Sequence, residues 1–256
     1  SVIIETVKLI KVFGPKPFVG DSSAWSTAQA CIKILGIEEE LEKLHVPVLS
    51  LNQPVLIHIQ NVKVGISRIA LDADAIINVP KLKSHQQLGG TFALKNMYGC
   101  VAGIMGKEKA WWHFAKGSNP EEFCELIVSL YQKLNPVFNI IDGIIAMEGA
   151  GPLNGDQKPL GILVGGANPL ACEEICRQIT GFSKEQLPLL KTAERMMDLK
   201  TQSIKILGDP IEPVLCSDFE YPRQIPIRFS LRRICKSLLK QILVLTKKLF
   251  VKKQMQ

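Results

Sequence analysis

The sequence lacks any pair of cysteines with the CxxC spacing. Its seven cysteines are scattered along 256 residues, so no local ligand set for zinc or for an iron–sulfur cluster is present. Cys172 and Cys176 lie one helical turn apart, and two buried apolar thiols are the favoured interpretation. A metal shared with a third ligand is the alternative. We expect reduced thiols and a cytoplasmic location.

Acidic residues are absent from the C-terminal end. From Arg228 onward there are nine Lys or Arg and no Asp or Glu. The remaining 22 basic residues stand against 24 acidic ones, so residues 1–227 carry a net charge of −2 although the whole chain carries +7. The basic character therefore belongs to the tail, and no nucleic-acid partner is expected for the rest of the chain.

Long apolar runs that could span a bilayer are also missing. From Ser230 onward, apolar residues such as Leu231, Ile234 and Leu238 recur at helical spacing, with Lys and Arg on the opposite face. This pattern predicts a basic amphipathic helix over residues 230–256. Each Lys or Arg near an anionic surface contributes ~1 kcal/mol, so contact with an anionic membrane surface or with a partner is favoured. Packing back onto the domain is the alternative.

Short apolar segments alternate with helical patterns along the rest of the chain. With 46% hydrophobic and 21% charged residues, the composition is that of an ordinary globular protein. The alternation predicts an α/β fold, with a mostly parallel sheet and helices on both faces. Strands are expected at residues 17–19, 46–51, 55–59, 74–79, 137–145, 161–164 and 204–207, and helices at 2–12, 27–35, 38–44, 91–98, 121–134, 170–180 and 188–198.

The domain organisation follows from these patterns. We expect an α/β domain over residues 1–210, a linker over 211–229 and the amphipathic helix over 230–256. The chain opens at Ser1, without an initiator methionine and directly in a helical pattern. We therefore expect that a first strand and turn precede this helix in the complete protein.

The densest group of reactive side chains follows the strand expected at 74–79. Lys81, Lys83 and His85 come directly after it, where an α/β protein holds its ligand. Lysines in such a loop can bind a phosphate or a carboxylate. A solvated basic loop is the alternative interpretation.

Lys95 and Asn96 lie in a glycine-flanked, apolar segment that includes Gly99. A lysine desolvated in such surroundings has a lowered pKa and is suited to act as a base or nucleophile. The alternative is a lysine whose stem is buried and whose amine reaches water.

Two further groups complete the candidate site. Trp111, Trp112 and His113 suggest a loop that covers a planar ligand, with His113 as a candidate acid or base. For the two tryptophans, a loop packed on the protein body is the alternative. Asp142, Glu148 and Gly151 follow in a strand end and a glycine-rich loop that can bind a cation or a ligand. Helix-capping acids in a turn are the alternative there. We predict Lys95, His85 and His113 as catalytic residues, and as ligand-binding residues Lys81, Lys83, Asn96, Gly99, Asp142, Glu148 and Gly151.

Long motifs in this region resemble those of the DUF362 family. They are VPKLKSH, ALKNMYGCVAG, IIDGIIAMEGAGPLNG and ILVGGANPLACEEICRQITGF, with VGDSS upstream, and the likeness spans residues 2–209. The resemblance implies an α/β fold, often followed by a ferredoxin-like segment with two cysteine-rich cluster motifs. In this sequence the basic tail stands in place of such a segment. Asn168 and Glu173 stand where the family usually has Asp, which weakens any metal site there.

The order of His85, a Gly-Gly pair, Lys95 and His113 is also similar to the N-terminal domain of the lactate-racemase family. That family holds a nickel-pincer nucleotide covalently through a lysine and uses histidines as acid–base groups on a 2-hydroxy acid. The resemblance would make Lys95 the cofactor lysine and the two histidines the acid–base pair. The glycine spacing around Lys95 differs from the pattern of that family.

Three classes of function stay open. The first is a small-molecule enzyme, an oxidoreductase or an isomerase, that acts on a small anionic ligand with or without a metal or nucleotide-type cofactor. The second is a redox accessory protein that works with a separate ferredoxin-like partner. The third is a non-catalytic binding module recruited by the tail, peripheral at a membrane. We take the first as the working hypothesis.

Overall fold

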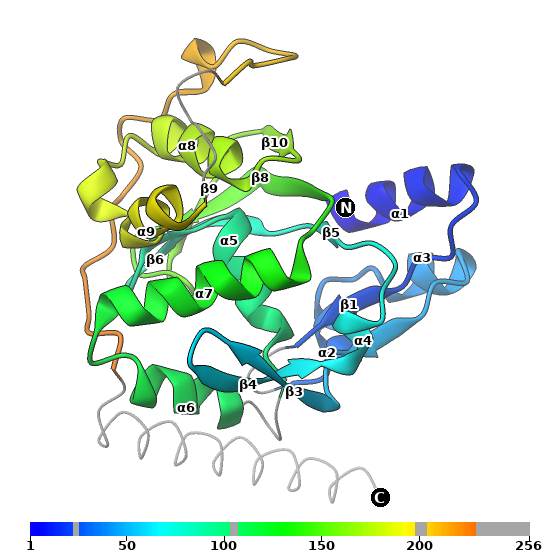
Figure 1. Ribbon diagram of the computed structural model, residues 1–256. Helices are drawn as coiled ribbons and strands as arrows, with labels where there is room; N and C mark the ends of the chain where they lie inside the picture. The colour runs from blue at the N-terminus through cyan, green and yellow to red at the C-terminus, as the bar shows by residue number, and fades with distance from the viewer. Residues whose placement is uncertain (23–25, 103–106, 198–203, 229–256) are drawn as a thin grey trace, which may run out of the picture.

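The computed structural model describes residues 1–22, 26–102, 107–197 and 204–228. Its largest element is a six-stranded sheet with the order β10-β8-β6-β7, in which β5 and β9 also pair with β8 (Figure 1). β5 and β6 run parallel to β8, whereas β7 runs antiparallel to β6, and β9 and β10 run antiparallel to β8. The strands are β5 (Ile77–Asn78), β6 (Lys81–His85), β7 (Gly89–Thr91), β8 (Phe138–Glu148), β9 (Asp156–Lys158) and β10 (Ile162–Gly166).

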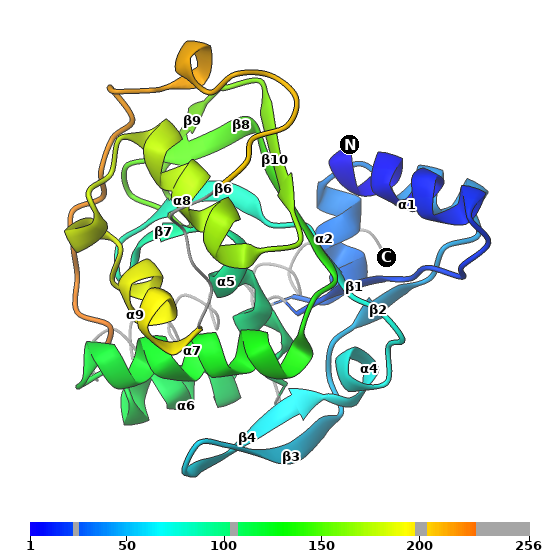
Figure 2. The same ribbon diagram turned by 45° about the horizontal axis from the view of Figure 1, so that its top comes forward.

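Four helices form a layer on this sheet. α5 and α8 pack against the strands, and α7 and α9 pack on them (Figures 1 and 2). The two longest begin alike: Asn119 and Asn168 accept hydrogen bonds from first-turn backbone N–H groups, and a proline follows each. These caps set the N-termini of α7 and α8. The helices are α5 (Ala93–Asn96), α7 (Pro120–Leu134), α8 (Pro169–Thr180) and α9 (Pro188–Met196).

The N-terminal residues form a smaller unit beside the sheet (Figure 2). Its two strands, β1 and β2, pair in parallel. It has a hydrophobic core of its own, formed by Ile4, Val7, Ile32, Ile37, Leu41 and Val46. The elements are α1 (Val2–Val12), β1 (Val19–Asp21), α2 (Ala28–Ile34), α3 (Glu38–Lys43) and β2 (Val48–Ser50).

An antiparallel hairpin and several short helices complete the described fold. The hairpin contacts α7, and none of the helices in the described ranges is both long and apolar enough to cross a membrane. These elements are β3 (Pro54–Ile59), β4 (Val62–Ser67), α4 (Arg68–Leu71), η1 (Met97–Cys100), α6 (Lys107–Ala115), η3 (Lys184–Gln186) and η4 (Glu212–Val214).

The α/β class is confirmed, as are the helices expected at 2–12, 27–35, 38–44, 121–134, 170–180 and 188–198. Three expectations about local structure are wrong. Residues 204–207 form no strand, because they pair with no neighbour among the described residues. Lys81, Lys83 and His85 belong to strand β6 rather than to a loop, and Trp111 to His113 belong to helix α6. The helix expected at 230–256 lies outside the described residues, and the expected linker 211–229 contributes Phe219 and Ile227 to the core.

Candidate functional site

Five cationic or titratable side chains come together from three elements. Lys83 and His85 lie on β6, Lys95 lies on α5, and Lys109 and His113 lie on α6. They are near enough to perturb one another: Lys95 lowers the pKa of both histidines, and Lys83 and Lys109 lower that of Lys95. We call these five residues the cationic cluster. It unites all three residues predicted as catalytic with Lys83, which was predicted to bind the ligand.

Burial is the main cause of the unusual acid–base properties of the cluster. It lowers the pKa of Lys95 to about 7 and that of Lys109 to about 8, because a desolvated ammonium is unfavourable. Burial also lowers the pKa of His113 to about 4 and the pKa of His85 well below its ordinary value. At neutral pH both imidazoles are therefore neutral, and Lys95 exists in both protonation states.

An aromatic ring, rather than a carboxylate, lies against Lys95. Its Nζ lies 4.4 Å from the centroid of the Tyr98 ring, a cation–π distance. His113 packs edge-on against Tyr98 at 5.8 Å and lies 4.6 Å from Phe123. Among the described residues, none of the cluster lysines forms an ion pair with a carboxylate.

Lys109 is the member that the sequence patterns did not identify. Its Nζ donates to the Ser22 carbonyl at 2.6 Å and to the Ser22 hydroxyl at 2.9 Å. Its backbone carbonyl accepts a hydrogen bond from the Tyr98 hydroxyl at 2.8 Å. Asp21, just before Ser22, raises the pKa of Lys109 and that of Lys83 and so opposes the effect of burial on both. In the sequence, Lys109 belongs to a short charged run, a pattern that is typical of a solvated surface.

Backbone groups orient the two histidines. His85 Nδ1 accepts a hydrogen bond from the backbone N–H of Gln87 at 3.2 Å, which assigns its ring proton to Nε2. His113 Nδ1 lies 3.2 Å from the Ile227 carbonyl, and a carbonyl can only accept, so this ring carries its proton on Nδ1. The Gln87 side chain donates to the carbonyls of Pro226 and Ile227. The segment at Pro226 and Ile227 thus contacts both helix α6, through His113, and the turn after β6, through Gln87.

Several predicted ligand-binding residues lie in other surroundings. Lys81 pairs with Asp142 at 2.6 Å, and both are at least partly exposed. Glu148 accepts from the Glu220 backbone N–H at 2.9 Å and lies 3.6 Å from Lys158. These contacts join strands and loops. Lys81 acts on the cationic cluster through its charge, which contributes to the lowered pKa of Lys83.

The remaining predicted residues have steric or structural roles in the fold. Asn96 donates to the Asn78 side chain at 2.8 Å, within a buried amide network that includes Asn139. Gly151 lies against β6, where a Cβ atom would overlap the Ser84 carbonyl. A Cβ on Gly99 would meet nothing within 4 Å, so there is open space one helical turn beyond Lys95.

Glu173 stabilises helix α5, which carries Lys95. Its buried carboxylate accepts a hydrogen bond from the Leu94 backbone N–H at 2.8 Å, and burial raises its pKa to about 7. It thereby anchors the first turn of α5, the helix that carries Lys95. No group of three or more His, Cys, Asp and Glu side chains within the described ranges is arranged to hold a metal ion.

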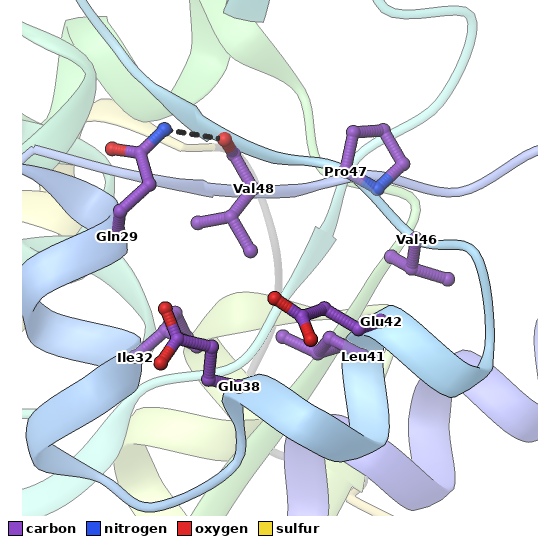
Figure 3. Close-up of a pocket in the computed structure, with 8 residues that line it drawn as sticks. All are labelled: Gln29, Ile32, Glu38, Leu41, Glu42, Val46, Pro47 and Val48. Atoms are coloured by element: carbon purple, nitrogen blue, oxygen red, sulfur yellow. Dashed lines mark hydrogen bonds between the residues drawn. The ribbon is translucent and has the colours of Figure 1, made fainter.

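A separate cavity of about 240 Å³ lies in the N-terminal unit (Figure 3). Glu38 and Glu42 project from α3 at its rim, and Gln29 spans to the Val48 carbonyl at 2.8 Å. Ile32 and Leu41 supply apolar lining. Because its charged groups are acidic, this cavity does not suit the anionic ligand that the cationic cluster favours.

The chain belongs to the DUF362 family, described as a domain of unknown function, whose model matches residues 1–178. A curated relative is a thylakoid-associated protein of Synechocystis sp., which is 32% identical over 255 residues, with 95% of this chain and 76% of that protein covered. Among solved structures, the lactate racemase apoprotein from Thermoanaerobacterium thermosaccharolyticum is similar with a TM-score of 0.40 and 12% identity. That alignment covers 56% of this chain and 37% of the racemase chain.

Proposed function

We propose that the cationic cluster binds a small anionic molecule and that Lys95 exchanges a proton with it. The observation that carries the proposal is the convergence of Lys83, Lys95 and Lys109, none of which forms an ion pair with a carboxylate among the described residues. The charge of Asp21 acts on Lys83 and Lys109, but one carboxylate cannot balance three desolvated lysines, and unbalanced desolvated charge is unfavourable. A bound anion supplies the missing negative charge, so the site favours a ligand with one or more oxyanion groups.

The roles of the lysines follow from their surroundings. Lys109 is held by Ser22 and Lys83 is fixed by its place in β6, so both are suited to hold the anion in one orientation. Lys95 rests on an aromatic ring and has a pKa of about 7. Its neutral amine can take a proton from the bound molecule, and the resulting ammonium is then stabilised by the negative charge that forms. The Lys95 ammonium can then return the proton to the ligand. The neutral His85, whose ring proton is on Nε2, is suited to donate a hydrogen bond to the bound molecule.

The test is mass spectrometry of the purified protein under native and denaturing conditions, followed by titration calorimetry with inorganic pyrophosphate and with malonate. A mass that is lost on denaturation identifies a non-covalent anion or nucleotide. A mass that survives and maps to Lys95 identifies a covalent cofactor. If the protein carries no added mass and binds neither probe, the anion site is wrong.

We also propose that the basic tail brings the protein to an anionic membrane surface. The amphipathic pattern of residues 230–256 supports this, as does the description of a relative as thylakoid-associated. Replacing Lys247, Lys248, Lys252 and Lys253 with Gln removes four positive charges. We expect this variant to lose binding to anionic vesicles, and the binding of the natural protein to weaken as salt is raised.

A further inference from the structure

We propose that the outer face of α6 is a second membrane-contacting surface, which inserts Trp111 and Phe114 into an anionic bilayer. This inference rests on the membrane contact proposed above and adds a defined surface to it. The occupant is a lipid bilayer with negatively charged headgroups.

The two aromatic rings form one exposed ridge. Trp111 is 56% exposed and Phe114 is 36% exposed, and their ring centroids lie 5.9 Å apart. They are three residues apart on one helix and therefore share a face. Aromatic side chains on an exposed helix face are typical of proteins that insert shallowly at a membrane interface.

A cation completes the ridge. The guanidinium of Arg228 lies 5.2 Å from the centroid of the Phe114 ring, and the Arg228 side chain is exposed. Arg228 is also the first of the nine basic residues that end the chain without any acid. The ridge therefore adjoins, in the sequence, the basic segment 228–256, whose charge fits anionic lipid. Residues 1–227 are nearly neutral, so a bilayer is favoured as the partner over a second copy of this protein.

The opposite face of the same helix carries two members of the cationic cluster, Lys109 and His113. Lys109 and His113 point inward to Ser22 and Ile227, and Trp112 is buried. Glu108, the acidic residue of α6, accepts a hydrogen bond from the indole of Trp112 at 3.2 Å. Just after the helix, Glu122 pairs with Lys116 and Glu121 pairs with Arg195. Helix α6 therefore joins the candidate anion site to the proposed membrane surface within nine residues.

The experiment compares partitioning of the full chain onto vesicles of phosphatidylcholine alone and onto vesicles that contain phosphatidylglycerol. Trp111→Ala and Phe114→Ala are each expected to reduce partitioning onto the anionic vesicles about tenfold, because each removes a large apolar side chain from the bilayer. The matched control is Leu163→Ala on β10. Leu163 is 55% exposed and β10 lies at the other end of the molecule from α6 in both views (Figures 1 and 2).

Fluorescence reports insertion directly. The difference in emission between the natural protein and Trp111→Phe isolates the signal of Trp111, which is expected to shift to the blue and to be quenched by brominated lipid chains. If the vesicles bind the protein but Trp111 is not quenched and both Ala variants bind normally, the α6 surface is wrong while the tail contact stands. If the natural protein binds no anionic vesicle, both proposals are wrong.

Discussion

Lys81 and Lys83 lie two residues apart on the same strand, yet the fold gives them opposite surroundings. Lys81 is partly exposed and pairs with Asp142 at 2.6 Å. Lys83 has a lowered pKa, because burial removes its ammonium from water, and it joins Lys95 and Lys109 in the cationic cluster. The register of β6 against β8 shifts between the two lysines, which separates their surroundings. Neighbouring lysines therefore need not share a function. Lys81 is neutralised by Asp142 and joins two strands, whereas Lys83 is desolvated and is suited to bind an anionic ligand.

The largest difference should appear in lysine reactivity. At pH 7, about half of the Lys95 side chains are neutral given a pKa of about 7, whereas an ordinary lysine is neutral about a thousandfold less often. Labelling with acetic anhydride across pH 5 to 11, read by peptide mass spectrometry, gives the midpoint for each lysine. We expect a midpoint near 7 for Lys95. If Lys95 in the folded protein is labelled with the pH midpoint of an ordinary lysine, the proposed desolvation of Lys95 is wrong.

Lys95→Met should weaken binding of inorganic pyrophosphate about a hundredfold, because the loss of one partner of a desolvated charge contact costs a few kcal/mol. The same change should raise the melting temperature at pH 6, since it removes a desolvated cation that has no ion-pair partner among the described residues. The control is Lys81→Met, which should bind pyrophosphate normally. Equal losses in both variants would mean that the two regions act as one site.

The acid sensitivity of the cluster is expected to be smaller. The pKa of His113 is about 4 in the folded protein and ~6.5 in an unfolded chain, so between these values only the unfolded chain binds the proton. The free energy of unfolding should therefore fall as the pH is lowered through this window, by on the order of 2 kcal/mol from this group. Denaturant unfolding of His113→Asn, which keeps a donor for the Ile227 carbonyl, should show a weaker pH dependence. His58→Asn, at an exposed position on β3, should leave the dependence unchanged.

The outer ion pair should contribute least. Asp142→Asn should lower the free energy of unfolding by less than about 1 kcal/mol, because partly exposed pairs are screened by water. It should change pyrophosphate affinity less than about twofold, since its partner Lys81 affects the pKa of Lys83 less than burial and Asp21 do. Urea unfolding and calorimetry on one preparation measure both quantities. A large loss of affinity would instead include Asp142 in the ligand site.

Local signals predicted much of the layer structure. Helix α7 begins at Asn119-Pro120 and ends at Asn135 in a left-handed conformation, and these are features that the residue types alone favour. Helix α6 was not predicted, because the segment around Trp111-Trp112 has no clear apolar periodicity. Strand β6 was missed as well: its sequence, KLKSH, is mostly polar, and pairing with β7 and β8 makes it a strand.

The candidate site divides in the same way. The types of residue at positions 83, 85, 95 and 113, and the apolar surroundings of Lys95, placed four of the five cluster residues among the predicted site residues. Lys109 could not be recognised, because its burial depends on Ser22, which is 87 residues away in the chain. The role of Asp142 was equally hidden, since its partner Lys81 is 61 residues away.

The sequence by itself determined the α/β class, the capped helices and the supply of lysines and histidines, because propensities and periodicities act over a few neighbouring residues. The tertiary structure decided which lysine is neutralised and which is desolvated. A pKa depends on the water removed and on the charges a few ångströms away, and in this fold those charges come from β1, β6, α5 and α6 together.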